Sequence, residues 1–216
     1  MYVAVAGNIG AGKSTLTRLL SSTFDLAPVY EAVEENPYLE DFYRDMERYA
    51  FHSQMFFLGK RLEQHLSQVN PGQRVIQDRT IYEDAAIFAY NLYADGVLSE
   101  RDYRSYRQMY EAISRALRPP DLLIYLEASL PTLRRHIAQR GRAYEAGIED
   151  DYLERLNELY RGWIDGYELS ELLVLPADDL DFVRSDADRE AVIELVERRG
   201  LSRPLVSAIR GQVGRG

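Results

Sequence analysis

The chain of 216 residues contains no cysteine, which excludes a disulfide framework, a thiolate metal site and a cysteine nucleophile. It has no apolar run that approaches the ~20 residues needed to cross a bilayer. The short apolar segment at residues 2–6 lacks the basic flank of a signal peptide. We therefore expect a cytoplasmic protein without a membrane partner.

The chain also lacks an excess of positive charge, because 26 basic residues stand against 35 acidic ones and the formal net charge is −9. A general nucleic-acid-binding protein usually carries a basic patch, so we expect no nucleic-acid partner. Only two of the 26 basic residues are lysines, Lys13 and Lys60. We interpret the preference for arginine as a compositional bias without a function of its own, and Lys60 as a solvated helix residue.

No internal repeat or long linker divides the chain, and we expect one domain at residues 1–201 with a flexible tail at residues 202–216. Apolar segments alternate with amphipathic ones, which predicts an α/β fold with a parallel sheet and helices on both faces. The predicted strands are residues 2–6, 27–30, 74–77, 122–126 and 172–175. The predicted helices are about residues 13–24, 36–69, 81–94, 99–117, 130–139, 150–170 and 186–199.

The first predicted strand runs into a phosphate-binding motif, Gly7-Asn8-Ile9-Gly10-Ala11-Gly12-Lys13-Ser14. Its glycines let backbone amides wrap a phosphate, and the helix that follows adds positive potential at its N-terminus. Lys13 supplies a compact charge for the β and γ phosphates, and the Ser14 hydroxyl can bind Mg²⁺. The motif predicts a three-layer P-loop NTPase-type fold, here with five parallel strands.

The motif alone does not separate a kinase from a GTPase switch or an ATP-driven motor. No Asn-Lys-x-Asp guanine-reading sequence is present, which counts against a Ras-like GTPase, and the chain is short for an elaborate motor. Charged residues at the ends of other strands favour a small-molecule phosphotransferase.

Asp78, Arg79 and Thr80 directly follow the third predicted strand. At the carboxyl edge of a parallel sheet, the Asp78 carboxylate would reach a metal beside Ser14, and Arg79 would hold phosphate oxygens. The alternative is a salt bridge at the strand end, with Thr80 as a helix cap.

Glu31 follows the second predicted strand, where a kinase needs a base for the attacking hydroxyl. From spacing alone, Glu34, Glu35 and Asp41 compete with Glu31 for that role.

A group of arginines lies at a helix end and in the loop after it: Arg134, Arg135, Arg140 and Arg142. They predict a basic lid at about residues 140–150 that closes over the transferring phosphates. Favourable charge at a helix C-terminus explains them equally well.

Together these residues resemble the deoxyribonucleoside kinase family, most closely its bacterial deoxyadenosine/deoxyguanosine kinase branch. The resemblance spans roughly residues 2–199 and rests on the phosphate loop and on residues 30–39, 78–84, 119–126 and 140–142. It implies an ATP-dependent enzyme that phosphorylates the 5′-hydroxyl of a deoxynucleoside in nucleotide salvage. It also implies Mg²⁺ as cofactor and a homodimer.

The resemblance implies roles for individual residues. Glu31 matches the catalytic base, Asp78 matches an acid that joins Ser14 at the metal, and Arg79 matches the arginine that positions the 5′-oxygen and the phosphates. The residues matched to ATP binding are Gly7, Asn8, Ile9, Gly10, Ala11, Gly12, Lys13, Ser14, Thr15, Arg140, Arg142, Asp181 and Phe182. Those matched to substrate binding are Glu31, Tyr43, Gln54, Arg61, Arg79, Asp84, Phe88, Glu145 and Tyr152.

Within the second set, Tyr43 and Glu145 match ligands of the sugar 3′-hydroxyl, and Phe88 and Tyr152 match walls of the pocket. Gln54, Arg61 and Asp84 match the polar groups that read the base edge. A side-chain amide offers a donor and an acceptor, and Arg61 can pair with Asp84. We expect a purine deoxynucleoside as substrate, with deoxycytidine left open.

Two positions depart from the family pattern: His136 stands where relatives often have arginine, with Arg135 beside it, and Ala32 stands where many have proline. The nearest alternative function is a thymidylate kinase, which shares the fold, the phosphate loop and an Asp-Arg motif. An alternative of another class is a nucleotide-binding regulatory protein without a small acceptor.

Overall fold

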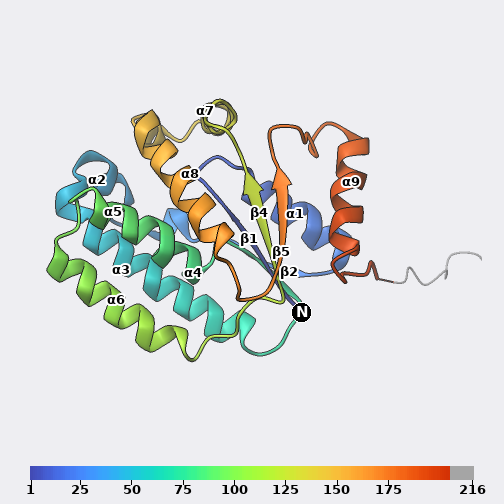
Figure 1. Cartoon of the computed structure of the whole chain (residues 1–216), viewed down its shortest axis with the longest axis horizontal. Helices are drawn as coiled ribbons and strands as arrows, with labels where there is room; N and C mark the ends of the chain where they lie inside the picture. Colours follow the sequence, from blue (N-terminus) through green and yellow to red (C-terminus); the bar gives the residue numbers. More distant parts are fainter. Residues whose placement is uncertain (205–216) are drawn as a thin grey trace, which may run out of the picture.

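The computed structural model describes residues 1–204, so the predicted tail lies outside the described residues from position 205 onward. Its centre is a sheet of five parallel strands in the order β2-β3-β1-β4-β5. The strands are β1 (Tyr2–Gly7), β2 (Ala27–Val29), β3 (Val75–Asp78), β4 (Leu122–Glu127) and β5 (Glu171–Pro176). Figure 1 shows α1 (Lys13–Phe24) and α9 (Asp186–Glu197) on one side of the sheet and most other helices on the other side. The predicted three-layer fold is confirmed.

The strand β1 lies in the middle of the sheet, and Val3 pairs with Ile76 of β3 and Leu122 of β4. All six of its residues are buried, which explains an apolar segment without alternation: both faces are covered by helices. The loop after β1 therefore emerges at the centre of the carboxyl edge, where the neighbouring strands also end.

The remaining helices are α2 (Leu39–Arg44), α3 (Met46–Gln64), α4 (Ile81–Glu83), α5 (Tyr90–Ala94), α6 (Glu100–Ser114), α7 (Leu130–Arg140) and α8 (Asp150–Asp165). Short 3-10 or π-helical turns join them: η1 (Val33–Glu35), η2 (His65–Val69), η3 (Asp84–Ala89) and η4 (Ala143–Glu145). The helices predicted to end at residues 117 and 170 end earlier, at Ser114 and Asp165. Over residues 1–204 there is no helix that combines the length and the apolar character needed to cross a membrane.

The prediction of one long helix over residues 36–69 is wrong near its start. The backbone leaves helical geometry at Asp45 (φ −149°, ψ 80°), which separates α2 from α3. The Asp45 carboxylate accepts a hydrogen bond from the backbone N–H of Arg48 and caps α3. The sequence conceals this break because neither glycine nor proline marks it.

The glycine loop is packed tightly against α7. Gly10 has a left-handed backbone (φ +84°), and a Cβ there would lie 2.8 Å from the Leu133 carbonyl oxygen and 2.9 Å from Cγ1 of Ile137. We expect Gly10→Ala to lower the free energy of unfolding by about 1–3 kcal/mol, because strain and overlap add. Thermal denaturation measures this. Gly59→Ala in α3 is the matched control, since a Cβ there would have no atom within 4 Å beyond its chain neighbours and its own helix backbone. This change is expected to leave the free energy of unfolding unchanged or to raise it. Equal effects of the two changes would contradict the expectation.

Candidate active site

A cleft of about 850 Å³ opens at the carboxyl edge of the sheet. The predicted site residues that line it are Ile9, Gly10, Ala11, Gly12, Lys13, Ser14, Thr15, Glu31, Tyr43, Gln54, Asp78, Arg79, Asp84, Phe88, Arg140, Arg142, Glu145, Tyr152, Asp181 and Phe182. Gly7, Asn8 and Arg61 do not line the cleft. The fold therefore brings residues from both ends of the chain into one cavity.

Lys13 is the first residue of α1 and is 7% exposed. Its ammonium donates a hydrogen bond of 2.9 Å to the Asn8 carbonyl oxygen across the loop. Burial lowers the pKa of Lys13 to about 8, and the positive charge of Arg79 acts in the same direction. The Lys13 ammonium is thus a largely desolvated positive charge that lies against the phosphate loop.

Asn8 faces the protein interior instead of the cleft. Its amide donates to the Leu153 carbonyl at 2.9 Å and to the Asn157 side chain at 2.8 Å, and its side-chain oxygen accepts from the Ile9 N–H. Asn8 therefore ties the phosphate loop to α8, while its backbone carbonyl accepts the hydrogen bond from Lys13.

Ser14 and Asp78 are in contact, although they are far apart in sequence. The Ser14 hydroxyl donates to one carboxylate oxygen of Asp78, and the other, Oδ1, is buried without a hydrogen-bond partner. Hydroxyl and carboxylate oxygens suit Mg²⁺, which commonly uses one or two protein ligands together with phosphates. No cluster of three or more His, Asp or Glu side chains within residues 1–204 forms a metal site by itself.

Glu31 lies between two buried arginines. Its Oε1 is 3.0 Å from Nε of Arg79 and accepts a hydrogen bond of 2.9 Å from Arg61. Burial alone would raise the pKa of the Glu31 carboxyl, but Arg79 and Arg61 lower it to about 2. The carboxylate is therefore ionised at neutral pH.

Arg79 has a left-handed backbone (φ +68°), which is costly for a residue with a side chain. The turn directs its guanidinium over the ring of Phe88, 4.1 Å from the centroid. Phe88 was predicted only as a wall of the pocket, and it is also the platform on which Arg79 stacks. No sequence pattern indicates this contact.

Arg61 extends the network to Asp84, whose carboxylate accepts a hydrogen bond of 2.9 Å from Nε. The predicted pairing of these residues is confirmed. Arg61 is 1% exposed and reaches both Glu31 and Asp84 from behind the cleft wall. Gln54 and Asp84 both line the cleft.

The lid arginines are paired with the acid predicted to bind sugar. Arg140 donates to Glu145 at 3.0 Å, and Arg142 at 3.5 Å. Tyr144 lies between Arg142 and Glu145 in sequence, and its ring stacks on that of Tyr43 with the centroids 5.7 Å apart. The lid segment thus lies against α2, which carries Tyr43.

The basic residues earlier in α7 do not all lie at the cleft. Arg134 pairs with Asp150 and does not line the cleft, whereas Arg135 and His136 do. His136 is not among the predicted site residues, and its Nδ1 lies 2.8 Å from the Gly10 carbonyl oxygen. It joins α7 to the phosphate loop.

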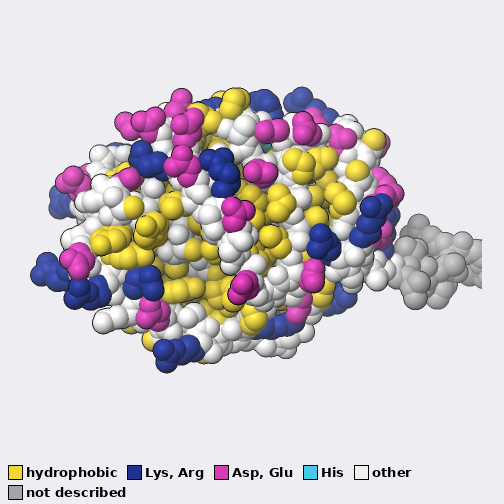
Figure 2. All heavy atoms as spheres, viewed as in Figure 1, with side chains coloured by type: hydrophobic (Ala, Val, Ile, Leu, Met, Phe, Trp, Pro, Cys, Tyr) yellow, Lys and Arg dark blue, Asp and Glu magenta, His cyan; other side chains and the backbone are white. Residues whose placement is uncertain are grey.

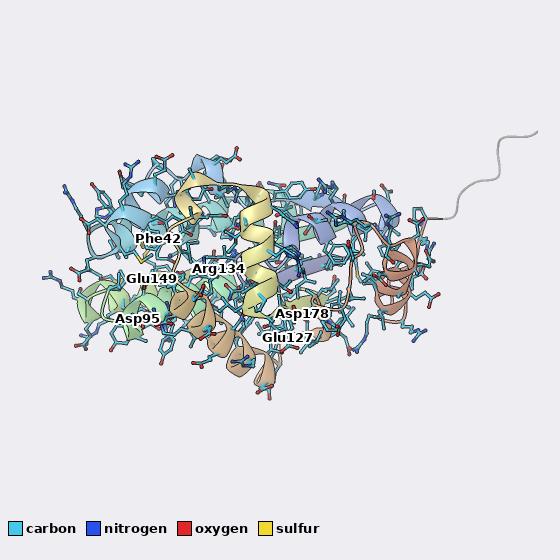
Figure 3. All side chains as sticks on the ribbon, turned by 90° about the horizontal axis from the view of Figure 1, so that it is seen from above. Phe42, Asp95, Glu127, Arg134, Glu149 and Asp178 are labelled. Atoms are coloured by element: carbon cyan, nitrogen blue, oxygen red, sulfur yellow. The ribbon has the colours of Figure 1, made fainter. Side chains whose placement is uncertain are left out.

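The loop after β5 forms the far end of the cleft. Phe182 is 8% exposed and lies beside Gly12, and the backbone N–H of Asp181 donates to Asp188 of α9 at 3.0 Å. Asp178 accepts hydrogen bonds from Ser129 at the start of α7. Figure 3 shows Asp178 at that end of α7 and Arg134 farther along the helix.

The sequence reasoning missed several residues of the cleft. Those that lie near Glu31, on α2 and α3, or in the lid segment are Tyr30, Val33, Leu39, Phe42, Ser53, Phe57 and Tyr144. Most are apolar residues on helical segments, which sequence alone does not distinguish from core. Tyr144 had a signal, because it lies between Arg142 and Glu145 in the predicted lid.

The fold and the site define a class. One cleft contains a phosphate loop with a buried lysine, a serine–aspartate pair, an ionised glutamate and several arginines. This combination of groups is typical of the active site of a P-loop phosphotransferase.

The sequence model of the family "Deoxynucleoside kinase" matches residues 3–199, and the chain belongs to this family. It is 38% identical over 199 residues to a deoxyadenosine/deoxycytidine kinase of Bacillus subtilis, covering 90% of each chain. It is 36% identical over 202 residues to a deoxyguanosine kinase of Lactobacillus acidophilus, covering 90% of this chain and 88% of that one. A structure of deoxyadenosine kinase from M. mycoides with dCMP and dCDP matches with a TM-score of 0.81 and 30% identity, covering 92% of this chain and 100% of that one.

The resemblance noted from the motifs is confirmed, and so is the prediction of a deoxynucleoside kinase. The protein is an enzyme that phosphorylates deoxynucleosides in nucleotide salvage, which decides against a regulatory protein without an acceptor.

Proposed function

We propose that this kinase acts in the cytoplasm and transfers the γ-phosphoryl group of ATP to the 5′-hydroxyl of deoxyadenosine or deoxyguanosine. Deoxycytidine is the next acceptor to test, because relatives are named for all three nucleosides. The observation that carries the acceptor assignment is the Glu31 carboxylate, which would repel the phosphate of a nucleotide acceptor.

In this proposal Glu31 is ionised and takes the proton of the 5′-hydroxyl. Lys13 and Arg79 stabilise the charge that spreads over the oxygens of the moving phosphoryl group. Ser14 and Asp78 would hold Mg²⁺, which neutralises charge on the donor phosphates when it is bound. The loop with Asp181 and Phe182 surrounds the adenine of the donor.

Glu145 has two uses in the proposed cycle. Its carboxylate pairs with Arg140 and Arg142. When donor phosphates attract these arginines, the Glu145 carboxylate is released and accepts a hydrogen bond from the sugar 3′-hydroxyl beside Tyr43. Gln54, Arg61 and Asp84 read the base, while Phe88 and Tyr152 line its pocket.

The function is tested by a coupled assay of ADP release with ATP and Mg²⁺. All four deoxynucleosides and thymidine monophosphate are compared as acceptors. We expect turnover on deoxyadenosine and deoxyguanosine and none on the monophosphate. Turnover on thymidine monophosphate alone would contradict the proposed acceptor.

Asp84→Ala is expected to change the ranking of deoxynucleosides. The ratio of kcat/KM between deoxyadenosine and deoxycytidine should shift by about tenfold or more, because one side of the base-reading pair is lost. The same kinetic panel measures it. Asp121→Ala is the control, because Asp121 pairs with Arg118 away from the cleft, and it should preserve the ranking. If Asp84→Ala also preserves it, Asp84 does not read the base.

We also propose that the protein forms homodimers, as the family resemblance implies. Figure 2 shows hydrophobic side chains gathered over α4, α5, α6 and the neighbouring part of α8. Tyr90 and Met109 lie on these helices and are 41% and 48% exposed. Light scattering after gel filtration tests this, and a monomer at micromolar concentration would contradict it.

A further inference from the structure

Glu83 is a buried acid without a part in the proposed transfer. It ends α4, is 0% exposed and does not line the cleft. Burial raises the pKa of its carboxyl, against the opposing charges of Arg79 and Lys13. A buried carboxyl group is costly unless hydrogen bonds compensate for lost solvation, so its partners indicate its use.

One carboxyl oxygen holds the turn that carries Arg79. Oε2 accepts a hydrogen bond of 3.3 Å from the Thr80 N–H, and the Thr80 hydroxyl accepts one of 3.2 Å from the Glu83 N–H. This capping box encloses the segment that directly follows Arg79. It stabilises a turn whose left-handed residue is unfavourable by itself.

The other carboxyl oxygen contacts a different element, the start of the phosphate loop. Oε1 of Glu83 accepts a hydrogen bond of 3.1 Å from the backbone N–H of Gly7, where β1 ends. A single carboxyl group thus joins the end of β1 to the turn after β3. A capping box needs only one of its oxygens.

Tyr160 of α8 closes the same network. Its hydroxyl contacts Oε1 of Glu83 and lies 2.9 Å from the Gly7 carbonyl oxygen. The side chain is 0% exposed and stacks on Tyr125 of β4, with centroids 5.5 Å apart. Tyr160 therefore contacts both the Gly7 carbonyl oxygen and the carboxyl oxygen that accepts the Gly7 N–H.

We propose that Glu83 and Tyr160 are positioning residues that set the distance between the phosphate loop and Arg79. Neither residue lines the cleft, so they act through Gly7 and through the Arg79 turn. Glu83 also acts on the Arg79 guanidinium, whose Nη1 lies 4.0 Å from Oε1 of Glu83. The proposal rests on the proposed roles of the phosphate loop and Arg79. Misplacement of these groups lowers the rate of transfer more than it weakens acceptor binding.

The first test compares Tyr160→Phe with Tyr2→Phe. Both variants lose one hydroxyl from a fully buried ring. Tyr2 is the control because its hydroxyl donates a hydrogen bond of 2.6 Å to Gln77, which does not line the cleft. We expect a similar fall in thermal midpoint for both. Tyr160→Phe should lower kcat about tenfold with the acceptor KM within about twofold, whereas Tyr2→Phe should leave kcat within about twofold. Equal kcat values in the two variants would overturn the proposal.

The second test is Glu83→Gln, which keeps the size of the side chain. Both carboxyl oxygens accept a backbone N–H, and an amide nitrogen cannot accept one, so one of the two links is lost. We expect kcat to fall at least about tenfold in a variant that still folds, as circular dichroism would show. Full kcat would overturn the proposal.

Failure of this proposal is distinguishable from failure of the proposed function. An inactive wild-type enzyme, or an Arg79→Ala variant with full activity, contradicts the proposed function. An active wild type with an impaired Arg79→Ala variant and unimpaired Tyr160 and Glu83 variants contradicts only the positioning role.

Discussion

Glu31→Gln is expected to lower kcat for deoxyadenosine by about 10²–10⁴-fold, the usual contribution of a general base. The amide keeps the size of the side chain and a contact to Arg61 or Arg79, but it cannot accept the proton of the 5′-hydroxyl. Steady-state ADP release at saturating ATP and nucleoside measures the loss. Because binding contacts largely remain, the acceptor KM should change much less than kcat.

The control for this substitution is Glu35→Gln, because Glu35 competed for the same role from spacing and instead pairs with Lys60 at 2.9 Å. It should leave kcat within about twofold. The pH profile gives a second check. Since the pKa of Glu31 is about 2, the carboxylate stays ionised as pH falls, and it should cause no acid limb in kcat/KM above about pH 4. Retained kcat in Glu31→Gln would remove the residue from the role of base.

Lys13→Arg is expected to lower kcat by about 10²–10³-fold although it keeps the charge. The Lys13 ammonium is buried and donates to the Asn8 carbonyl inside a loop of close backbone contacts. A planar guanidinium is larger and directs its donors in a fixed fork, so it does not fit the place of a compact point charge. Single-turnover transfer separates the loss of chemistry from weaker ATP binding.

Lys60→Arg is the matched control. Lys60 lies at the surface of α3 and pairs with Glu35 at 2.9 Å and Glu63 at 3.0 Å, so the prediction of a solvated helix residue was incomplete. Arginine can make the same exposed pairs, and kcat should stay within about twofold. If Lys13→Arg is equally active, the phosphate loop does not need a compact charge.

The local parts of this protein were accessible to sequence reasoning. The phosphate loop is contiguous, and its function depends on glycines and on a helix start that the same residues form. The central strands β1, β3 and β4 follow from short apolar segments, since a strand buried on both faces needs no alternation. Both features are decided by residues close together in the chain.

The break at Asp45 is local but was not predicted, because a side-chain cap three residues from Arg48 makes it and no glycine or proline marks it. The surroundings of Glu31 depend on distant contacts. The position of Glu31 between two buried guanidinium groups depends on Arg79 and Arg61, which are 48 and 30 residues away. No spacing pattern near Glu31 contains these arginines.

The sequence by itself determined the class of fold, the phosphate loop and, through its motifs, the family. Only the tertiary structure decided which charges pair, with Arg61 between Glu31 and Asp84 and Arg140 with Glu145. It also decided which backbone groups Glu83 holds, the N–H of Gly7 and that of Thr80. The reason is physical. A motif is specified by neighbouring residues and backbone geometry, whereas the pairing of buried charges depends on which strands end side by side.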